Sequence, residues 1–341
     1  MKRLALALLI TACGAAEHEP LPEPVYDFGC PNESSLACTG LYGPVGEHWY
    51  SKRLGSGVEP FTPAAALWSD HMHKQRYVWL PPGSTIDTTD PDDWTFPVGT
   101  KLWKEFSYEG KRIETRLLEK RNYEWRAATY RWTEDEMDAL SITEGERNVP
   151  GTFEDRYEVP AVRDCRRCHQ GARDQVLGFS AVLLAGADAQ GLTLQKLQQT
   201  AKLSTSPPAL QVPGTPVDQA ALSYLHVNCG VACHNPSWNA EAWWTGFYLK
   251  LDARDLTQVS ETAAHRTGVG QDSYIVDPAR PDRYLKLIAP GEPERSAVVY
   301  RDGERGSEMQ MPPLATHSVD EAGLAAVKAW ISSLPATRPT P

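Results

Sequence analysis

The chain has 341 residues, of which 41% are hydrophobic and 23% are charged, a composition typical of a globular protein with about two domains. Its formal net charge of −10, without a long basic run, excludes a surface that follows nucleic-acid phosphates. Beyond the N-terminus, no segment approaches the roughly 20 consecutive apolar residues that a membrane-spanning helix needs.

The N-terminus has the features of an export signal. Lys2 and Arg3 precede an apolar run over residues 4–10, and small residues then lead to Cys13. The string ITAC resembles a bacterial lipobox, which implies removal of residues 1–12 and a lipid on Cys13. We therefore expect an exported protein in the periplasm or at the outer membrane, with this anchor as its one attachment to the membrane. A plain signal peptide that leaves Cys13 as an unused thiol is the alternative.

Residues 13–58 form a Pro-rich linker. Within it, Cys30 and Cys38 flank a short polar loop. In an oxidising compartment such a pair favours a local disulfide. Chain entropy makes that disulfide worth about 2 to 3 kcal/mol of stability, mostly local in effect.

Residues 59–158 predict an antiparallel β-rich domain. The runs RYVWLPPGSTI, KLWKEFSYEGKRIETRLLEK and EWRAATYRW are rich in β-branched and aromatic residues and are separated by Gly- and Pro-containing breaks. Three tryptophans are expected to fill the core or to cover a cofactor: Trp79, Trp103 and Trp125. The following TEDEMDAL predicts a short helix capped at Thr133.

Residues 159–215 contain the first cysteine motif, with short helices and a linker. Cys165, Cys168 and His169 form a C-x-x-C-H string, the attachment signature of c-type haem. Two sulfurs one helical turn apart lie on one face and can each form a thioether to one haem edge. His169 then becomes the proximal iron ligand. Zinc held by the thiolates of both cysteine pairs is the alternative.

The sequence does not single out a distal ligand for this first haem. Four side chains are candidates: His71, Met72, His73 and His226. His226 lies one helical turn before the second motif and could ligate iron or simply pack.

The second motif, in residues 216–335, has one more residue between its cysteines. Cys229 and Cys233 are followed by His234, and the i, i+4 spacing still places both sulfurs on one helix face. Asp218 is suited to cap the preceding helix. Four positions of that helix fall at helical spacing: Leu222, Leu225, Cys229 and Cys233. A disulfide or an unfilled site is the alternative to a second haem here.

Residues 216–334 resemble class I cytochrome c. Met309 or Met311 precedes a Pro-Pro turn, and a final helix begins at a capping box from Ser318 to Glu321. The resemblance implies thioethers at Cys229 and Cys233, His234 as proximal ligand and Met311 as distal ligand. The predicted fold class is therefore α+β, an antiparallel β-rich N-terminal domain followed by an all-α cytochrome c-like region.

Over its length the chain resembles a family of exported bacterial haem c proteins with a β-rich front and two cysteine-histidine motifs. The resemblance implies covalently bound haem c, in two copies, and electron transfer with redox partner proteins of the cell envelope; nucleic acid is not expected as a partner. A haem with an open sixth position, acting as a peroxidase-like oxidoreductase, is the alternative function. The prediction leans towards an electron carrier rather than an enzyme.

Overall fold

In the computed structural model of the protein, the described residues are 34–43, 52–122, 124–208 and 210–335. Cys13, Cys30 and the predicted signal peptide lie outside them. Cys38 is disulfide-bonded, and its pairing with Cys30 stays a prediction. No helix in the described part of the chain combines the length and the apolar character needed to cross a bilayer.

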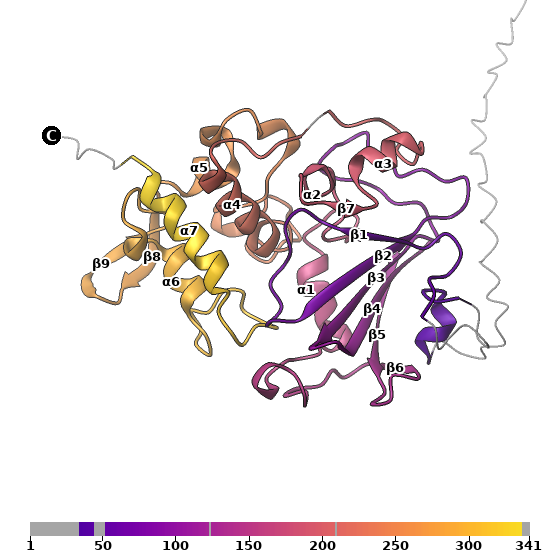
Figure 1. The fold of residues 1–341 in the computed structure, drawn as a ribbon. Coiled ribbons are helices and arrows are strands. Elements are labelled where there is room, and N and C mark those ends of the chain that lie inside the picture. Colours follow the sequence, from indigo (N-terminus) through magenta and orange to yellow (C-terminus); the bar gives the residue numbers. More distant parts are fainter. Residues whose placement is uncertain (1–33, 44–51, 123, 209, 336–341) are drawn as a thin grey trace, which may run out of the picture.

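A seven-stranded antiparallel sheet dominates the fold (Figure 1). Its strand order is β6-β5-β4-β3-β2-β1-β7. The strands are β1 (Glu59–Thr62), β2 (His73–Trp79), β3 (Lys101–Tyr108), β4 (Lys111–Arg121), β5 (Glu124–Trp132), β6 (Ala139–Ile142) and β7 (Gln190–Gly191). The long aromatic runs of the sequence form β2 to β5, which pair consecutively.

Both faces of the sheet are covered. On one face Trp103 and Tyr130 pack with Leu36 of the N-terminal segment, and Trp103 Nε1 donates to Thr39 Oγ1 at 3.1 Å. On the other face Leu102 packs with Phe179 in a second cluster of buried side chains. The prediction that Trp103 fills the core is confirmed, since its side chain is 1% exposed.

Most of the described helices are short, and only α4 and α7 among them have ten or more residues. The α-helices are α1 (Cys165–His169), α2 (Ala181–Ala185), α3 (Leu194–Gln199), α4 (Pro216–Leu225), α5 (Ala263–Gly268), α6 (Ala297–Gly303) and α7 (Glu321–Ser333). A π-helix, η4 (His226–Gly230), continues α4. The 3-10 helices are η1 (Leu36–Thr39), η2 (Phe153–Asp155), η3 (Val162–Asp164), η5 (Trp243–Thr245), η6 (Ala253–Asp255), η7 (Val259–Glu261) and η8 (Pro293–Arg295). The helix predicted from Thr133 is absent, because Thr133 to Asp138 form a turn that leads into β6.

The predicted fold class is wrong in its second half, because residues 216–335 are not all-α. They include the hairpin of β8 (Asp272–Asp277) and β9 (Arg280–Lys286), which Figure 1 shows projecting beside α7. The sequence DSYIVDPARPDRYLK carries β-branched and aromatic residues on both sides of a Pro-containing turn, which favours strands. The protein is a sheet-rich α+β protein.

The two long helices of this region pack against each other. Leu222 and Leu225 of α4 share a core with Val327 and Ile331 of α7. The cap of α7 is Asp320 rather than the predicted Ser318, because the Asp320 carboxylate accepts from the Gly323 backbone N–H. At α4 the cap is Thr215, and Asp218 completes the capping box.

Gly323 marks the closest approach of α7 to α4. A Cβ atom at this position would lie 1.9 Å from Tyr224 Cε2. We therefore expect Gly323→Ala to lower the free energy of unfolding by about 1 to 3 kcal/mol, because the helices must separate or the ring must move. Urea denaturation measures the loss. Gly303→Ala is the matched control, since its Cβ would lie 3.6 Å from Leu324 Cδ2, an ordinary contact. Equal stability of the two variants would contradict this packing.

Candidate functional site

The first cysteine motif faces a cavity of about 190 Å³. Cys165, Cys168 and His169 of α1 line one wall, and strands β2 to β4 supply another. Further lining residues come from 227–228 and 231–233, around the second motif, and from 312–316, directly after Met311. Others lie within 61–69, 127–128, 157–164 and 176–178. In Figure 1 α1 lies between the strands and the orange to yellow C-terminal segments. The cavity thus lies where the sheet meets the C-terminal region.

The His169 ring is fixed in one tautomer. Its Nδ1 lies 2.6 Å from the Gln175 carbonyl oxygen, and because a carbonyl can only accept, Nδ1 carries the proton. Burial, followed by the charge of Lys104, lowers the pKa of His169 to about 3. The ring is therefore neutral near pH 7, with its Nε2 lone pair available. Ligand histidines in metal sites commonly have this outer hydrogen bond.

The two thiols of this motif are free. Neither Cys165 nor Cys168 forms a disulfide. Burial raises the pKa of both thiols above the ordinary value. Both thiols are thus protonated at neutral pH. Because neither is part of a disulfide, both can still form a covalent bond to a ligand.

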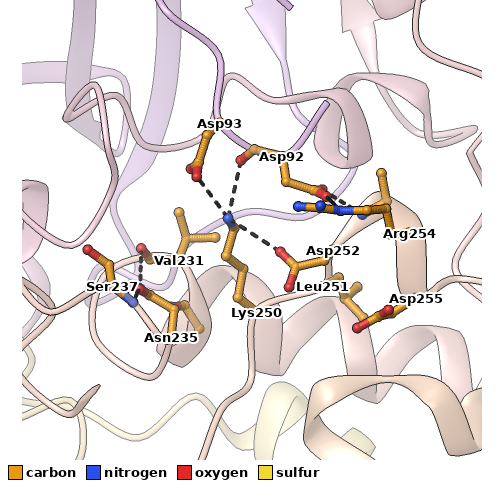
Figure 2. Close-up of polar contacts among 12 residues, drawn as sticks. Asp92, Asp93, Val231, Asn235, Ser237, Lys250, Leu251, Asp252, Arg254 and Asp255 are labelled. Atoms are coloured by element: carbon orange, nitrogen blue, oxygen red, sulfur yellow. Dashed lines mark hydrogen bonds and ion pairs between the residues drawn. The ribbon is translucent and has the colours of Figure 1, made fainter. Parts of the chain in front are cut away.

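The second motif absorbs its additional residue in a π-turn. The Val231 N–H donates to the His226 carbonyl at 2.9 Å, and the His234 N–H donates to the Cys229 carbonyl at 2.8 Å, both across five residues. Such π-bulges inside helices are frequent at functional sites. The Asn235 amide holds this turn, because it donates to the Gly230 carbonyl at 2.9 Å and to the Val231 carbonyl at 3.1 Å (Figure 2).

His234 repeats the arrangement of His169. Its Nδ1 donates to the Phe247 carbonyl at 3.0 Å, and burial lowers its pKa. The Nε2 lone pair is again left available. Both Cys229 and Cys233 are free thiols, and burial raises the pKa of Cys233 to about 12.

The two motifs are neighbours in the fold. Cys233 lines the same cavity as Cys165 and Cys168, whereas Cys229 and His234 are not among its lining residues. The backbones of the two segments are in close contact, since a Cβ at Gly171 would lie 2.0 Å from the Ala232 carbonyl oxygen. Arg167 and Glu241 add an ion pair of 2.7 Å between the two segments.

Met311 lies in a loop tied to α6. Its N–H donates to the Arg301 carbonyl at 2.9 Å, and Arg301 Nε donates to the Met309 carbonyl at 2.8 Å. The charge of Arg301 contributes, after burial, to the lowered pKa of His234. Met311 is half-buried and does not itself line the cavity. Its assignment as a distal ligand stays a prediction.

None of the four distal candidates reaches the cavity of the first motif. The His71 ring lies against Trp68 and Phe153, with centroid distances of 4.7 and 4.0 Å. Met72 is buried in a separate cluster, and His73 is exposed at the start of β2. His226 Nδ1 accepts the Leu251 N–H at 2.9 Å, and its Nε2 has no hydrogen bond.

His226 makes stability depend on pH. Burial, followed by the charge of Lys250, lowers its pKa to about 3 from the ordinary 6.5. The unfolded chain binds a proton at this ring below pH 6.5, and the folded chain does not until about pH 3. The free energy of unfolding therefore falls as the pH falls through this window, by about 2 kcal/mol between pH 7 and 5. Urea denaturation at both pH values should show this loss, with a smaller loss in His226→Gln. An identical pH dependence in the two proteins would contradict it.

A charged cluster ties the second motif to the sheet domain (Figure 2). Lys250 forms ion pairs with Asp93 at 3.6 Å and Asp252 at 3.4 Å, and donates to the Asp92 carbonyl at 3.2 Å. Burial alone would lower the pKa of Lys250, but the surrounding carboxylates raise it. Arg254 adds an ion pair of 3.5 Å to Asp92. The segment after His234 is thereby held to the loop that precedes β3.

The sequence reasoning missed the basic side chains of the cavity wall. Four of them line it: Lys74, Arg76, Lys104 and Arg116. Strand alternation alone could have placed Lys74 with Arg76 on one face of β2. Which residues of β3 and β4 join them depends on the strand register.

Searches of family models, curated proteins and solved structures found no match to this chain. In the described ranges, no group of three or more His, Cys, Asp or Glu side chains is placed to hold a metal ion.

Proposed function

We propose that the protein is an exported c-type cytochrome that holds haem covalently at its first cysteine motif and transfers electrons in the cell envelope. One observation carries the proposal. Two free thiols and a neutral histidine with an available Nε2 lie together on the wall of a single cavity. This donor set fits haem c, which requires two sulfurs and one imidazole from adjacent positions in the chain.

Three residues would hold the group. The sulfurs of Cys165 and Cys168 would form the thioethers, and His169 Nε2 would ligate the iron. Bound haem supplies one-electron redox chemistry. The Gln175 carbonyl orients the imidazole and increases its basicity through the hydrogen bond to Nδ1.

The cavity walls control the surroundings of that site. Leu102, Phe106 and Leu118 from the sheet line it, and Pro312 and Pro313 line another side. Such apolar walls limit water and keep the local dielectric low, which influences the reduction potential. The loop that carries Met311 therefore also shields the first motif.

We propose a second haem at Cys229, Cys233 and His234, with Met311 as distal ligand. The available Nε2 of His234 and the free thiols support it. The π-turn supports it further, because it accommodates the residue that the usual spacing lacks. A lipid anchor at Cys13 and a disulfide between Cys30 and Cys38 belong to the same proposal for an envelope protein.

Replacement of each cysteine pair by alanine, one pair at a time, tests both haem sites. Intact mass spectrometry of the exported protein should show two covalent haems. Cys165→Ala/Cys168→Ala and Cys229→Ala/Cys233→Ala should each carry one fewer. If Cys229→Ala/Cys233→Ala keeps the haem content of the wild type, the second haem site is overturned and the first is unaffected.

A haem-dependent oxidoreductase is the second candidate function. One observation favours it, because the cavity beside His169 is lined by no other histidine and by no methionine among the described residues. A haem there would have an open or weakly held sixth position. A high-spin ferric spectrum that shifts on addition of cyanide or peroxide would favour this candidate, and a low-spin spectrum insensitive to both would favour the electron carrier.

A further inference from the structure

Three cationic side chains lie side by side on the face of the sheet that lines the cavity. Arg76 of β2 stands opposite Lys104 of β3, and Lys104 stands opposite Arg116 of β4. All three line the cavity. Like charges directly opposite each other on neighbouring strands destabilise a sheet. This row therefore needs an anion to offset it.

The described protein supplies an anion for one member of the row. Arg116 donates from Nε and Nη2 to the Glu114 carboxylate at 2.9 and 2.6 Å. The side chains of Arg76 and Lys104 have no hydrogen bond or ion pair within the described ranges. Arg76 is only 6% exposed.

Leaving these cations without partners is costly. Burial lowers the pKa of Arg76 to about 10. Burial, followed by the charges of Arg76 and Arg116, lowers the pKa of Lys104 to about 7. Charges are rarely buried in proteins without a partner, because the loss of hydration is uncompensated. Two unpartnered cations on one cavity wall thus point to an anionic occupant.

We propose that Arg76 and Lys104 bind the two propionate carboxylates of the haem attached at Cys165 and Cys168. The inference rests on the proposed function, because it takes the haem from there. Haem carries its carboxylates on the edge away from the thioether bonds. The thiols of α1 and the cations of β2 and β3 come from different elements and line one cavity, so a single molecule bound there can contact both sets. A guanidinium can hold a carboxylate through two parallel hydrogen bonds.

Charge removal in the exported full-length holoprotein tests this assignment. The variants are Arg76→Gln and Lys104→Gln. Haem content should stay at the wild-type value, because the attachment residues are intact. The equilibrium constant for reduction of the first haem should fall about tenfold in each variant, which is about 59 mV, since a nearby cation favours the less positive, reduced site. The first haem is identified in the titration as the component that Cys165→Ala/Cys168→Ala loses.

Controls separate this role from a general effect of charge. Lys111→Gln removes a cation from the same sheet, but its side chain is 46% exposed and pairs with Glu134, so the potential should stay unchanged. Arg76→Lys and Lys104→Arg should keep most of the wild-type potential. Redox-induced infrared difference spectra should show shifted haem carboxylate bands in the two Gln variants only.

Several results would overturn the inference. Unchanged potentials and carboxylate bands in both Gln variants would do so. Loss of the low-spin spectrum in Lys104→Arg would instead indicate that the Lys104 amine is an iron ligand. A wild-type potential that depends on added inorganic phosphate would assign the row to a free anion. Failure of the proposed function itself would appear earlier, as a wild-type protein without covalent haem.

Discussion

Replacement of His169 by alanine should lower the content of covalently bound haem at the first motif by at least about tenfold, since removal of an outer partner alone costs 10- to 100-fold in metal affinity. The remaining haem should lose its proximal nitrogen and become high-spin. The thioether sites survive in this variant, so a small yield of attached haem is expected. Haem staining and the ferric absorption spectrum measure the two effects.

His73→Ala is the matched control for this experiment. His73 is exposed at the start of β2 and does not line the cavity, so its haem content and spectrum should equal those of the wild type. Equal spectra for His169→Ala and the wild type would remove His169 as a ligand.

Replacement of Asp174 by alanine should lower the free energy of unfolding by about 3 to 5 kcal/mol, because it leaves a buried cation unpaired. Lys120 Nζ lies 2.7 and 2.8 Å from the two carboxylate oxygens of Asp174. The same carboxylate accepts from Trp125 Nε1 at 3.0 Å and from the Phe96 N–H at 2.6 Å. Three donors of the sheet domain would lose their acceptor. Urea denaturation measures the loss.

The Asp174 variant should also disturb the first motif. The next residue, Gln175, provides the carbonyl that accepts from His169, and Asp174 fixes that segment to the sheet. We expect a broadened or shifted haem spectrum along with the lower stability. Asp188→Ala, at an exposed position of the same region, should change neither. A fully stable Asp174→Ala protein would contradict this role.

The sequence was sufficient for the sheet but not for the C-terminal region. Long runs such as KLWKEFSYEGKRIETRLLEK carry the strand signal locally, with a Gly-containing turn between β3 and β4. In residues 216–335 the two helices with clear apolar stripes predict an all-α region, because the segments between them give no comparable signal. The hairpin of β8 and β9 has the β-branched and aromatic residues of strands, but its apolar side chains, including Tyr274 and Tyr284, are exposed, so its sequence marks no buried face.

The candidate site also has one part that the sequence predicts and one part that it does not. Cys165, Cys168 and His169 are adjacent in the chain, so a short string defines them, and helical geometry brings them together. The row of Arg76, Lys104 and Arg116 comes from three strands, and only the register of β2, β3 and β4 aligns it. Likewise, a hydrogen bond to the Gln175 carbonyl depends on the path of the loop after α1, which no local pattern encodes.

We propose above all that iron porphyrin is covalently bound to the cysteines of this chain. The most direct measurement is the absorption spectrum of the purified, exported protein after denaturation in alkaline pyridine and reduction. We predict the spectrum of haem c, with two equivalents per chain. A colourless protein with both cysteine pairs intact and no Soret band would contradict the account.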